Sequence, residues 1–188
     1  MLAESVDFLS GRDLTPGEDE ALLAVRPAGH PASLYEHCCR AIDRSLRSGV
    51  HGLPLFGGGD WNDGMNRVGR AGRGESVWMG FFLARAIDAF LLIVAAQGDE
   101  ERRRLYEHHR GNLAQALETA GWDGEWYRRG YYDDGAPLGS RESDECRIDA
   151  LAQAWSVLSG AADPARAARA VAAAEERLVS EREGLMST

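Results

Sequence analysis

The fold is decided by residues Ser76–Ala96, which read SVWMGFFLARAIDAFLLIVAA. Apolar residues recur at helical spacing along one side of this segment, namely at Val77, Phe81, Ala84, Ile87, Leu91 and Ala95, and further apolar residues stand beside them. So broad an apolar surface predicts a helix in the interior of a helical domain. Arg85 and Asp88 interrupt the run from Phe81 to Ala96, and we expect this run to be too short to cross a bilayer.

Four more helices are predicted around this segment. The first begins at Ser33, where Ser33 and Glu36 have the spacing of a capping box. Another spans about Glu100–Ala120 and opens with acidic residues, which suit the positive end of a helix dipole. The last two span about Glu145–Ser159 and a segment that opens with Asp163-Pro164, a cap followed by a first-turn proline.

These helices predict an all-α fold with long loops and at most one small β-hairpin, which would turn at Asp134-Gly135. Residues 1–32 are rich in glycine, proline and acidic residues, so we expect an irregular lead-in before a helical domain over residues 33–188. Antiparallel helix pairs of this kind form bundles, solenoids or α/α barrels. The lack of a clean short repeat disfavours the solenoid.

Charge and cysteine content exclude several classes of function. The formal net charge of -9 and the pI near 5.0 argue against a nucleic-acid partner and against an anionic membrane. Every basic residue is arginine, which excludes a Schiff-base lysine within these residues. The three cysteines, Cys38, Cys39 and Cys146, lack the spacing of a zinc site or a disulfide framework. We therefore expect no metal, no membrane contact by this segment and a reducing compartment.

The segment Gly57–Asn66, GGGDWNDGMN, has the composition of a sugar-binding loop. Carboxylates bind hydroxyl groups or protonate a glycosidic oxygen, an indole face packs on a pyranose ring, and amides both donate and accept hydrogen bonds. Glycines allow the backbone to come close to a ligand. Taken alone, the same residues also fit an ordinary polar turn between two helices.

Several blocks in the same order resemble the catalytic module of glycoside hydrolase family 94, over roughly residues 34–182. The blocks are Leu34–Cys38, Gly52–Leu55, Gly59–Gly69, Gly74–Trp78, Trp122–Tyr127, Asp133–Gly135, Leu138–Ser140, Glu145–Asp149 and Gln153–Gly160. Within the family, the sequences of these blocks are most similar to the carboxy-terminal part of cyclic β-1,2-glucan synthases and to β-1,2-oligoglucan phosphorylases. The resemblance implies that these residues are part of an (α/α)6 barrel.

The resemblance also implies a function, an inverting glycoside phosphorylase or glycosyltransferase module that acts on β-glucan, most simply β-1,2-linked. It makes Asp63 the general acid and places Trp61 in the sugar site. Inorganic phosphate would be the co-substrate and nucleophile, without a cofactor, so no second carboxylate is needed as base. Asp60 and Asn62 are assigned to sugar binding or to bracing the loop, with equal weight on each.

Three neighbouring features have a simpler structural interpretation beside the functional one. Glu75-Ser76 fits a helix cap better than a substrate contact. Arg67, Arg70 and Arg73 fit a solvated basic loop better than a phosphate site. Trp122 and Trp126 lie in the aromatic segment Trp122–Tyr127, and they fit packing beneath a loop at least as well as sugar stacking.

Family members are several hundred residues long, so we expect the phosphate ligands and the other helices from the remaining barrel of a larger polypeptide or from a homo-oligomer. Two other functions stay open. One is a catalytically incomplete carbohydrate-binding or assembly segment of a larger cyclic glucan synthase. The other is a glucoamylase-like α/α-barrel hydrolase, which would require a second carboxylate. The expected location is the cytoplasm, free or as a cytoplasmic part of an inner-membrane synthase, because no signal peptide is visible at Met1.

Overall fold

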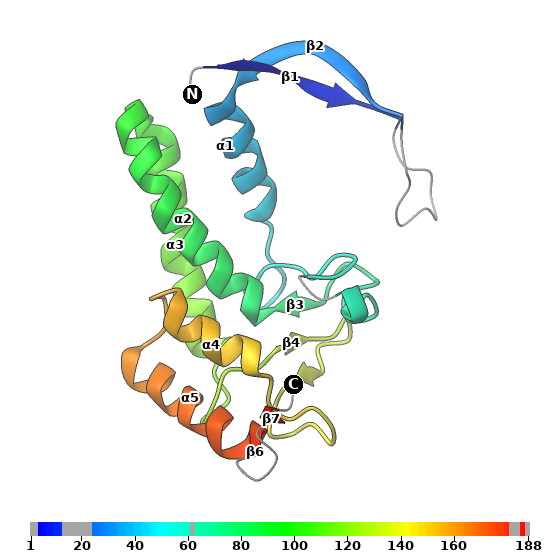
Figure 1. Ribbon diagram of the computed structural model, residues 1–188, viewed down its shortest axis with the longest axis vertical. Coiled ribbons are helices and arrows are strands. Elements are labelled where there is room, and N and C mark those ends of the chain that lie inside the picture. Colours follow the sequence, from blue (N-terminus) through cyan, green and yellow to red (C-terminus); the bar gives the residue numbers. More distant parts are fainter. Residues whose placement is uncertain (1–3, 13–23, 61–62, 181–184, 187–188) are drawn as a thin grey trace. The chain divides into compact units, whose positions relative to one another are not determined.

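The computed structural model describes residues 4–12, 24–60, 63–180 and 185–186. The chain divides into two compact units, Met1–Leu46 and Arg47–Thr188. The predicted boundary follows residue 32, whereas this division follows residue 46. Figure 1 labels the elements of both units.

The first unit is an antiparallel strand pair followed by a helix. Strand β1 (Ser5–Ser10) pairs with β2 (Arg26–Ser33), and α1 (Leu34–Ser45) follows β2 directly. The predicted cap is confirmed, because the Ser33 side chain accepts a hydrogen bond from the Glu36 backbone N–H at 3.2 Å. Phe8 of β1 packs on α1, with its ring centroid 3.9 Å from that of His37.

These strands correct the prediction of an irregular lead-in over residues 1–32. Pro27 and Pro31 were expected to break regular structure, yet both lie within β2. A two-stranded ribbon consists of edge strands, and proline is tolerated where no ladder hydrogen bond is required from its nitrogen. The strand pair also places Phe8 on α1, which stabilises an arrangement that local composition does not indicate.

The second unit is organised around α2 (Val77–Gln97), which follows the predicted helix closely. The Ser76 side chain caps its start by accepting from the Met79 N–H at 3.1 Å, and Gly98 ends it in the left-handed conformation. Figure 1 shows α3 (Glu100–Ala116) returning alongside α2. A π-helical turn, Leu117–Gly121, extends α3 to about the predicted end.

By length and composition, α2 is apolar enough to span a membrane, which corrects the expectation that this stretch is too short. The regular helix begins four residues before Phe81 and so reaches 21 residues. Within the protein, Ile87 and Val94 of α2 are fully buried. Asp88, one of the two charges that interrupt the run, is paired with Arg110 of α3 at 3.0 Å.

Two further helices follow in the chain, and the first packs against α2 while the second packs against the first. The start of α5 (Pro164–Leu178) is as predicted, with Asp163 as cap and Pro164 in the first turn. Helix α4 (Ala150–Leu158) starts five residues later than predicted. The reason is Asp149, whose carboxylate accepts from the N–H groups of Leu151 and Ala152 and so sets the first turn.

Short strands connect the helices and correct the expectation of at most one small hairpin. The predicted hairpin at Asp134-Gly135 is present, as β4 (Gly130–Tyr131) and β5 (Pro137–Leu138). A third strand, β3 (Glu75–Ser76), pairs with β4 on its other side, and β6 (Val179–Ser180) pairs with β7 (Leu185–Met186) near the C-terminus. Strands of two residues carry no detectable alternation, so only long-range pairing reveals them.

Gly130 is required where β3 and β4 meet, and we expect Gly130→Ala to destabilise the unit. A methyl group there would collide with the backbone oxygen of Glu75 and would lie 2.8 Å from the Phe56 ring. Overpacking of this kind costs about 1–3 kcal/mol of unfolding free energy, measurable by chemical denaturation. Gly111→Ala is the control, because nothing lies within 4 Å of that site in α3 and alanine is the better helix former. Equal stability of the two variants would contradict the prediction.

The described residues contain five α-helices and few strands, which is consistent with the predicted helical fold. The closed (α/α)6 barrel stays a prediction.

Candidate functional site

The four predicted site residues fall in the loop between Phe56 and Val68. Trp61 and Asn62 lie outside the described residues. Asp63 opens the 3-10 turn Asp63–Met65, of which the backbone is described. Of the four residues, Asp60 is the one with described side-chain contacts.

Asp60 is held by a buried guanidinium. Arg129 Nη2 donates to Asp60 Oδ1 at 2.7 Å, and Arg129 Nη1 lies 2.6 Å from Asp60 Oδ2. The Ser76 hydroxyl also donates to Oδ2 at 2.9 Å. The exposed fraction is 0% for the Asp60 side chain and 2% for that of Arg129. Because both carboxylate oxygens are engaged and shielded, the geometry favours loop bracing over sugar binding for Asp60.

Arg129 is in turn fixed by elements distant in the sequence. Its backbone N–H donates to the Leu138 carbonyl at 2.8 Å, and its carbonyl accepts from the Val77 N–H at 3.2 Å. Its Nε lies 3.3 Å from Asp149, the cap of α4. The start of α2, the start of α4 and the β4–β5 hairpin therefore converge on this side chain.

An apolar contact anchors the loop on the other side of Asp63. Met65 packs on a buried cluster formed by Phe56, Val68 and Leu138. The Val68 N–H donates to the Met65 carbonyl at 3.1 Å, and the Phe56 N–H donates to the Gly74 carbonyl at 2.8 Å. The backbone that carries Asp63 is thus held by the ion pair of Asp60 three residues before it and by packing of Met65 two residues after it.

The next turn is held by Asp133, from the hairpin. The Asp133 carboxylate accepts from the backbone N–H groups of Ala71 at 2.6 Å, Arg73 at 2.8 Å and Gly74 at 2.9 Å. The hydrogen bond from Ala71 is the main reason why the pKa of Asp133 lies below its usual value, and those from Arg73 and Gly74 act in the same direction. Arg67, Arg70 and Arg73 are exposed, as a solvated basic loop requires.

We expect Asp133→Asn to lower the unfolding free energy at neutral pH by about 1 kcal/mol, because the carboxylate is partly exposed. The folded-state pKa is below the unfolded value near 3.8, so the stabilisation is present above that value and is lost as the pH falls through the folded-state pKa. The difference between wild type and variant should therefore shrink on acidification, measured by urea denaturation at a series of pH values. Asp134→Asn is the control, since Asp134 bonds Ala136 two residues away. A difference that is independent of pH would contradict this account.

Glu75 has a structural role that residue type alone does not show. Its side chain is 1% exposed and accepts from the backbone N–H groups of His51 and Leu53, at 3.0 and 3.1 Å. The His51 ring also contacts Glu75, Nδ1 to Oε2 at 2.5 Å, and stacks on Tyr131. Together with the confirmed cap at Ser76, these contacts support the structural interpretation of Glu75-Ser76.

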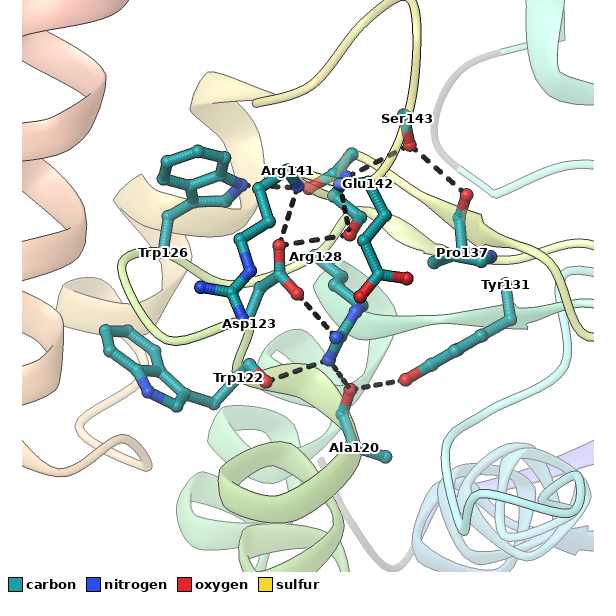
Figure 2. A network of polar contacts seen from close by, with 12 residues as sticks. Ala120, Trp122, Asp123, Trp126, Arg128, Tyr131, Pro137, Arg141, Glu142 and Ser143 are labelled. Carbon is teal, nitrogen blue, oxygen red and sulfur yellow. Dashed lines mark hydrogen bonds and ion pairs between the residues drawn. The ribbon is translucent and has the colours of Figure 1, made fainter.

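The aromatic segment after α3 is packed inside the unit. Trp126 is 2% exposed, and its Nε1 donates to the carbonyls of Gly139 and Arg147. Figure 2 shows Asp123 at the centre of the adjoining network, where it bonds Arg128 at 2.5 Å and the Arg141 backbone N–H at 2.7 Å. Of the two interpretations of Trp126, packing beneath a loop is the one that this geometry supports.

Arg129 is the functional candidate that sequence reasoning missed. It lies 69 positions from Asp60, and its neighbour Arg128 forms a separate ion pair with Asp123. Two adjacent arginines give no indication of which one reaches the loop. Among the described residues, no cluster of three or more metal-binding side chains is present.

The chain is similar in sequence to one protein family and to several known members of it. Residues 14–188 match the family model of the glycosyl hydrolase 94 superfamily, catalytic domain. The chain is 52% identical over 180 residues to the cyclic beta-(1,2)-glucan synthase NdvB of Rhizobium meliloti (strain 1021). These residues cover 95% of the chain and 6% of that protein.

Two phosphorylases of Paenibacillus borealis are also similar. The 3-O-beta-D-glucopyranosyl-beta-D-glucuronide phosphorylase is 38% identical over 161 residues, which cover 84% of the chain and 21% of that protein. The solabiose phosphorylase is 35% identical over 182 residues, which cover 95% of the chain and 22% of that protein. The chain therefore spans less than a quarter of the length of each of these relatives.

Proposed function

Because this chain belongs to the glycosyl hydrolase 94 superfamily, we propose that it is the segment of a glycoside phosphorylase or glucan synthase module that carries the general acid. The observation that supports this most is the match over residues 14–188, which contains the whole loop around Asp63. The proposed role of Asp63 is to protonate the bridging oxygen of a β-glucoside.

The chemistry requires such a group. A sugar alkoxide is too basic to leave unaided, so the carboxylic acid donates its proton to the bridging oxygen as the bond to the anomeric carbon breaks. Phosphate attacks that carbon from the opposite face, which inverts its configuration and forms α-glucose 1-phosphate. The Asp63 carboxylate left by this step is reprotonated before the next cycle. Phosphate is already an anion, so the reaction needs no second carboxylate as base.

The anchoring of the loop supports this role. Catalytic groups must be held close to their productive position, and supporting contacts around them provide this. Asp60 is bound by Arg129 before Asp63, and Met65 is packed after it. Trp61 and Asn62, between the two anchors, are proposed to contact the sugar.

The proposed substrate is a β-glucan oligosaccharide, with β-1,2-linked glucan preferred because the 52% identical relative is a cyclic beta-(1,2)-glucan synthase. The phosphorylases among the relatives support inorganic phosphate as the second substrate, with no cofactor. We place the protein in the cytoplasm, free or as the cytoplasmic part of an inner-membrane synthase.

The proposed partner of this segment is the remaining barrel, in the same polypeptide or in a second copy. Large apolar side chains of the second unit remain exposed on α2 and α4, including Leu92 (76%), Leu158 (64%) and Val157 (55%). Surfaces of this kind are typically covered by another element.

The test uses the full-length protein that contains this chain. Incubation with β-1,2-linked glucan oligosaccharides and inorganic phosphate should release α-glucose 1-phosphate, detected by coupled enzymatic assay. Turnover that does not depend on phosphate would instead identify a glucoamylase-like hydrolase. Calorimetric binding of the glucan without any turnover would identify a carbohydrate-binding or assembly segment.

A further inference from the structure

We infer that Arg129 is the positioning residue for the proposed general acid and acts through the Asp60 carboxylate. This inference rests on the proposed function of Asp63. Arg129 does not touch the sugar in this scheme; it holds Asp60, and through Asp60 it limits where the backbone of residue 63 can lie.

The contact between Arg129 and Asp60 has a defined geometry. Two nitrogens of Arg129 engage two oxygens of Asp60, at 2.7 Å for Nη2 to Oδ1 and 2.6 Å for Nη1 to Oδ2. A guanidinium bound in this two-pronged way fixes the direction of the carboxylate as well as its distance. Ser76 completes the arrangement, since its hydroxyl accepts from Arg129 Nη1 at 3.2 Å and donates to Asp60 at 2.9 Å.

Arg129 also has little freedom to move. Its backbone is bonded on both sides, to Leu138 and to Val77. Gly139 packs against its backbone so closely that a methyl group there would stand 2.7 Å from the Arg129 nitrogen. The guanidinium therefore transmits the position of the β4–β5 hairpin and the α2 start to the loop.

Asp60 and Asp63 are also close to each other along the chain. Residues 60 and 63 are three positions apart, so the backbone between them spans at most about 11 Å. The position of Asp60 therefore limits where the backbone of residue 63 can lie. Misplacement of a reacting group by about 1 Å can cost about 10²-fold in rate.

The same chain provides a matched control for the effect of losing a buried ion pair. Arg128 is the adjacent residue and forms its own ion pair with Asp123, whose side chain is 1% exposed. Arg128 also donates to the carbonyls of Ala120 and Trp122 (Figure 2). These contacts brace the segment after α3 and do not include residues 57–69.

The experiment compares Arg129→Lys with Arg128→Lys in the full-length protein. Lysine keeps the charge in both variants. In Arg129→Lys it removes the two-pronged contact with Asp60, and in Arg128→Lys it removes the guanidinium that joins Asp123 to the Ala120 and Trp122 carbonyls. Arg129→Lys should lower kcat for phosphorolysis by about 10²-fold with little change in KM for phosphate, and it should speed amide hydrogen exchange in peptides covering residues 57–69. Arg128→Lys should speed exchange in residues 120–141 and leave kcat nearly unchanged at a similar loss of thermal stability.

Equal losses of kcat in the two variants, or unchanged exchange in residues 57–69 of Arg129→Lys, would overturn the inference. If Arg129→Lys fails to fold, the same measurements are made on Asp60→Asn, because asparagine has the shape of aspartate without its charge. If the wild-type protein shows no turnover, the proposed function fails, and the hydrogen-exchange comparison alone then decides whether Arg129 holds the loop.

Discussion

Replacement of Asp63 by asparagine should reduce kcat for phosphorolysis by about 10²–10⁴-fold, the usual contribution of a general acid. Asparagine has nearly the same shape as aspartate and cannot donate a proton to the bridging oxygen. The loop anchors at Asp60 and Met65 are unchanged, so thermal stability should be close to that of the wild type. Initial rates of α-glucose 1-phosphate release measure the effect.

Two comparisons make this result specific. Asp144→Asn changes an exposed carboxylate to an amide and should keep wild-type kcat. The rate of Asp63→Asn should fall less with an aryl glucoside that has a weakly basic leaving group than with the glucan. The reason is that such a leaving group needs less protonation in order to depart. Wild-type rates in Asp63→Asn would remove Asp63 from the chemistry and leave the family assignment in place.

Of the substitutions proposed for the second unit, Asp60→Ala should cause the largest loss of unfolding free energy. Removal of one partner of a buried ion pair typically costs about 3–5 kcal/mol, because the other charge stays buried without compensation. We expect the lower end of this range, since Arg129 keeps Asp149 at 3.3 Å from its Nε. Chemical denaturation of the full-length protein, followed by hydrogen exchange in residues 57–76, measures the change.

The control for this prediction is an exposed ion pair of the same unit. Glu125 lies 3.3 Å from Arg177, and both side chains are more than 40% exposed. Exposed pairs contribute at most about 1 kcal/mol, so Glu125→Ala should have a small effect. Similar losses in Asp60→Ala and Glu125→Ala would show that the Asp60 pair is not the structural anchor described above.

Much of the helical organisation could be predicted from the sequence, because its signals are local. Ser33, Ser76, Asp99 and Asp163 each cap a helix in the structure, and each cap is bonded to a backbone N–H within three residues. The start of α4 was missed although Asp149 carries the same kind of signal. The predicted start at Glu145 lies before Asp149, whose carboxylate sets the first turn of α4.

The strands were predicted less well, because pairing partners lie far apart. Pro27 and Pro31 indicate a break when only their neighbours are considered, yet β2 is stabilised by β1, whose residue Asp7 pairs with Pro31. The pairing of Glu75 with Tyr131 joins residues more than fifty positions apart. No periodicity within a two-residue strand can indicate such a contact.

The sequence by itself determined the family, the helices and the candidate acid, because motifs, periodicity and caps involve residues within a few positions of one another. Only the tertiary structure supplies an observation that favours one of the two roles of Asp60 over the other. Its side chain is a carboxylate suited to either a sugar or a cation, and burial against Arg129, 69 positions away, favours the cation. A charged group out of water needs an opposite charge beside it, and which residue supplies that charge depends on how the elements pack.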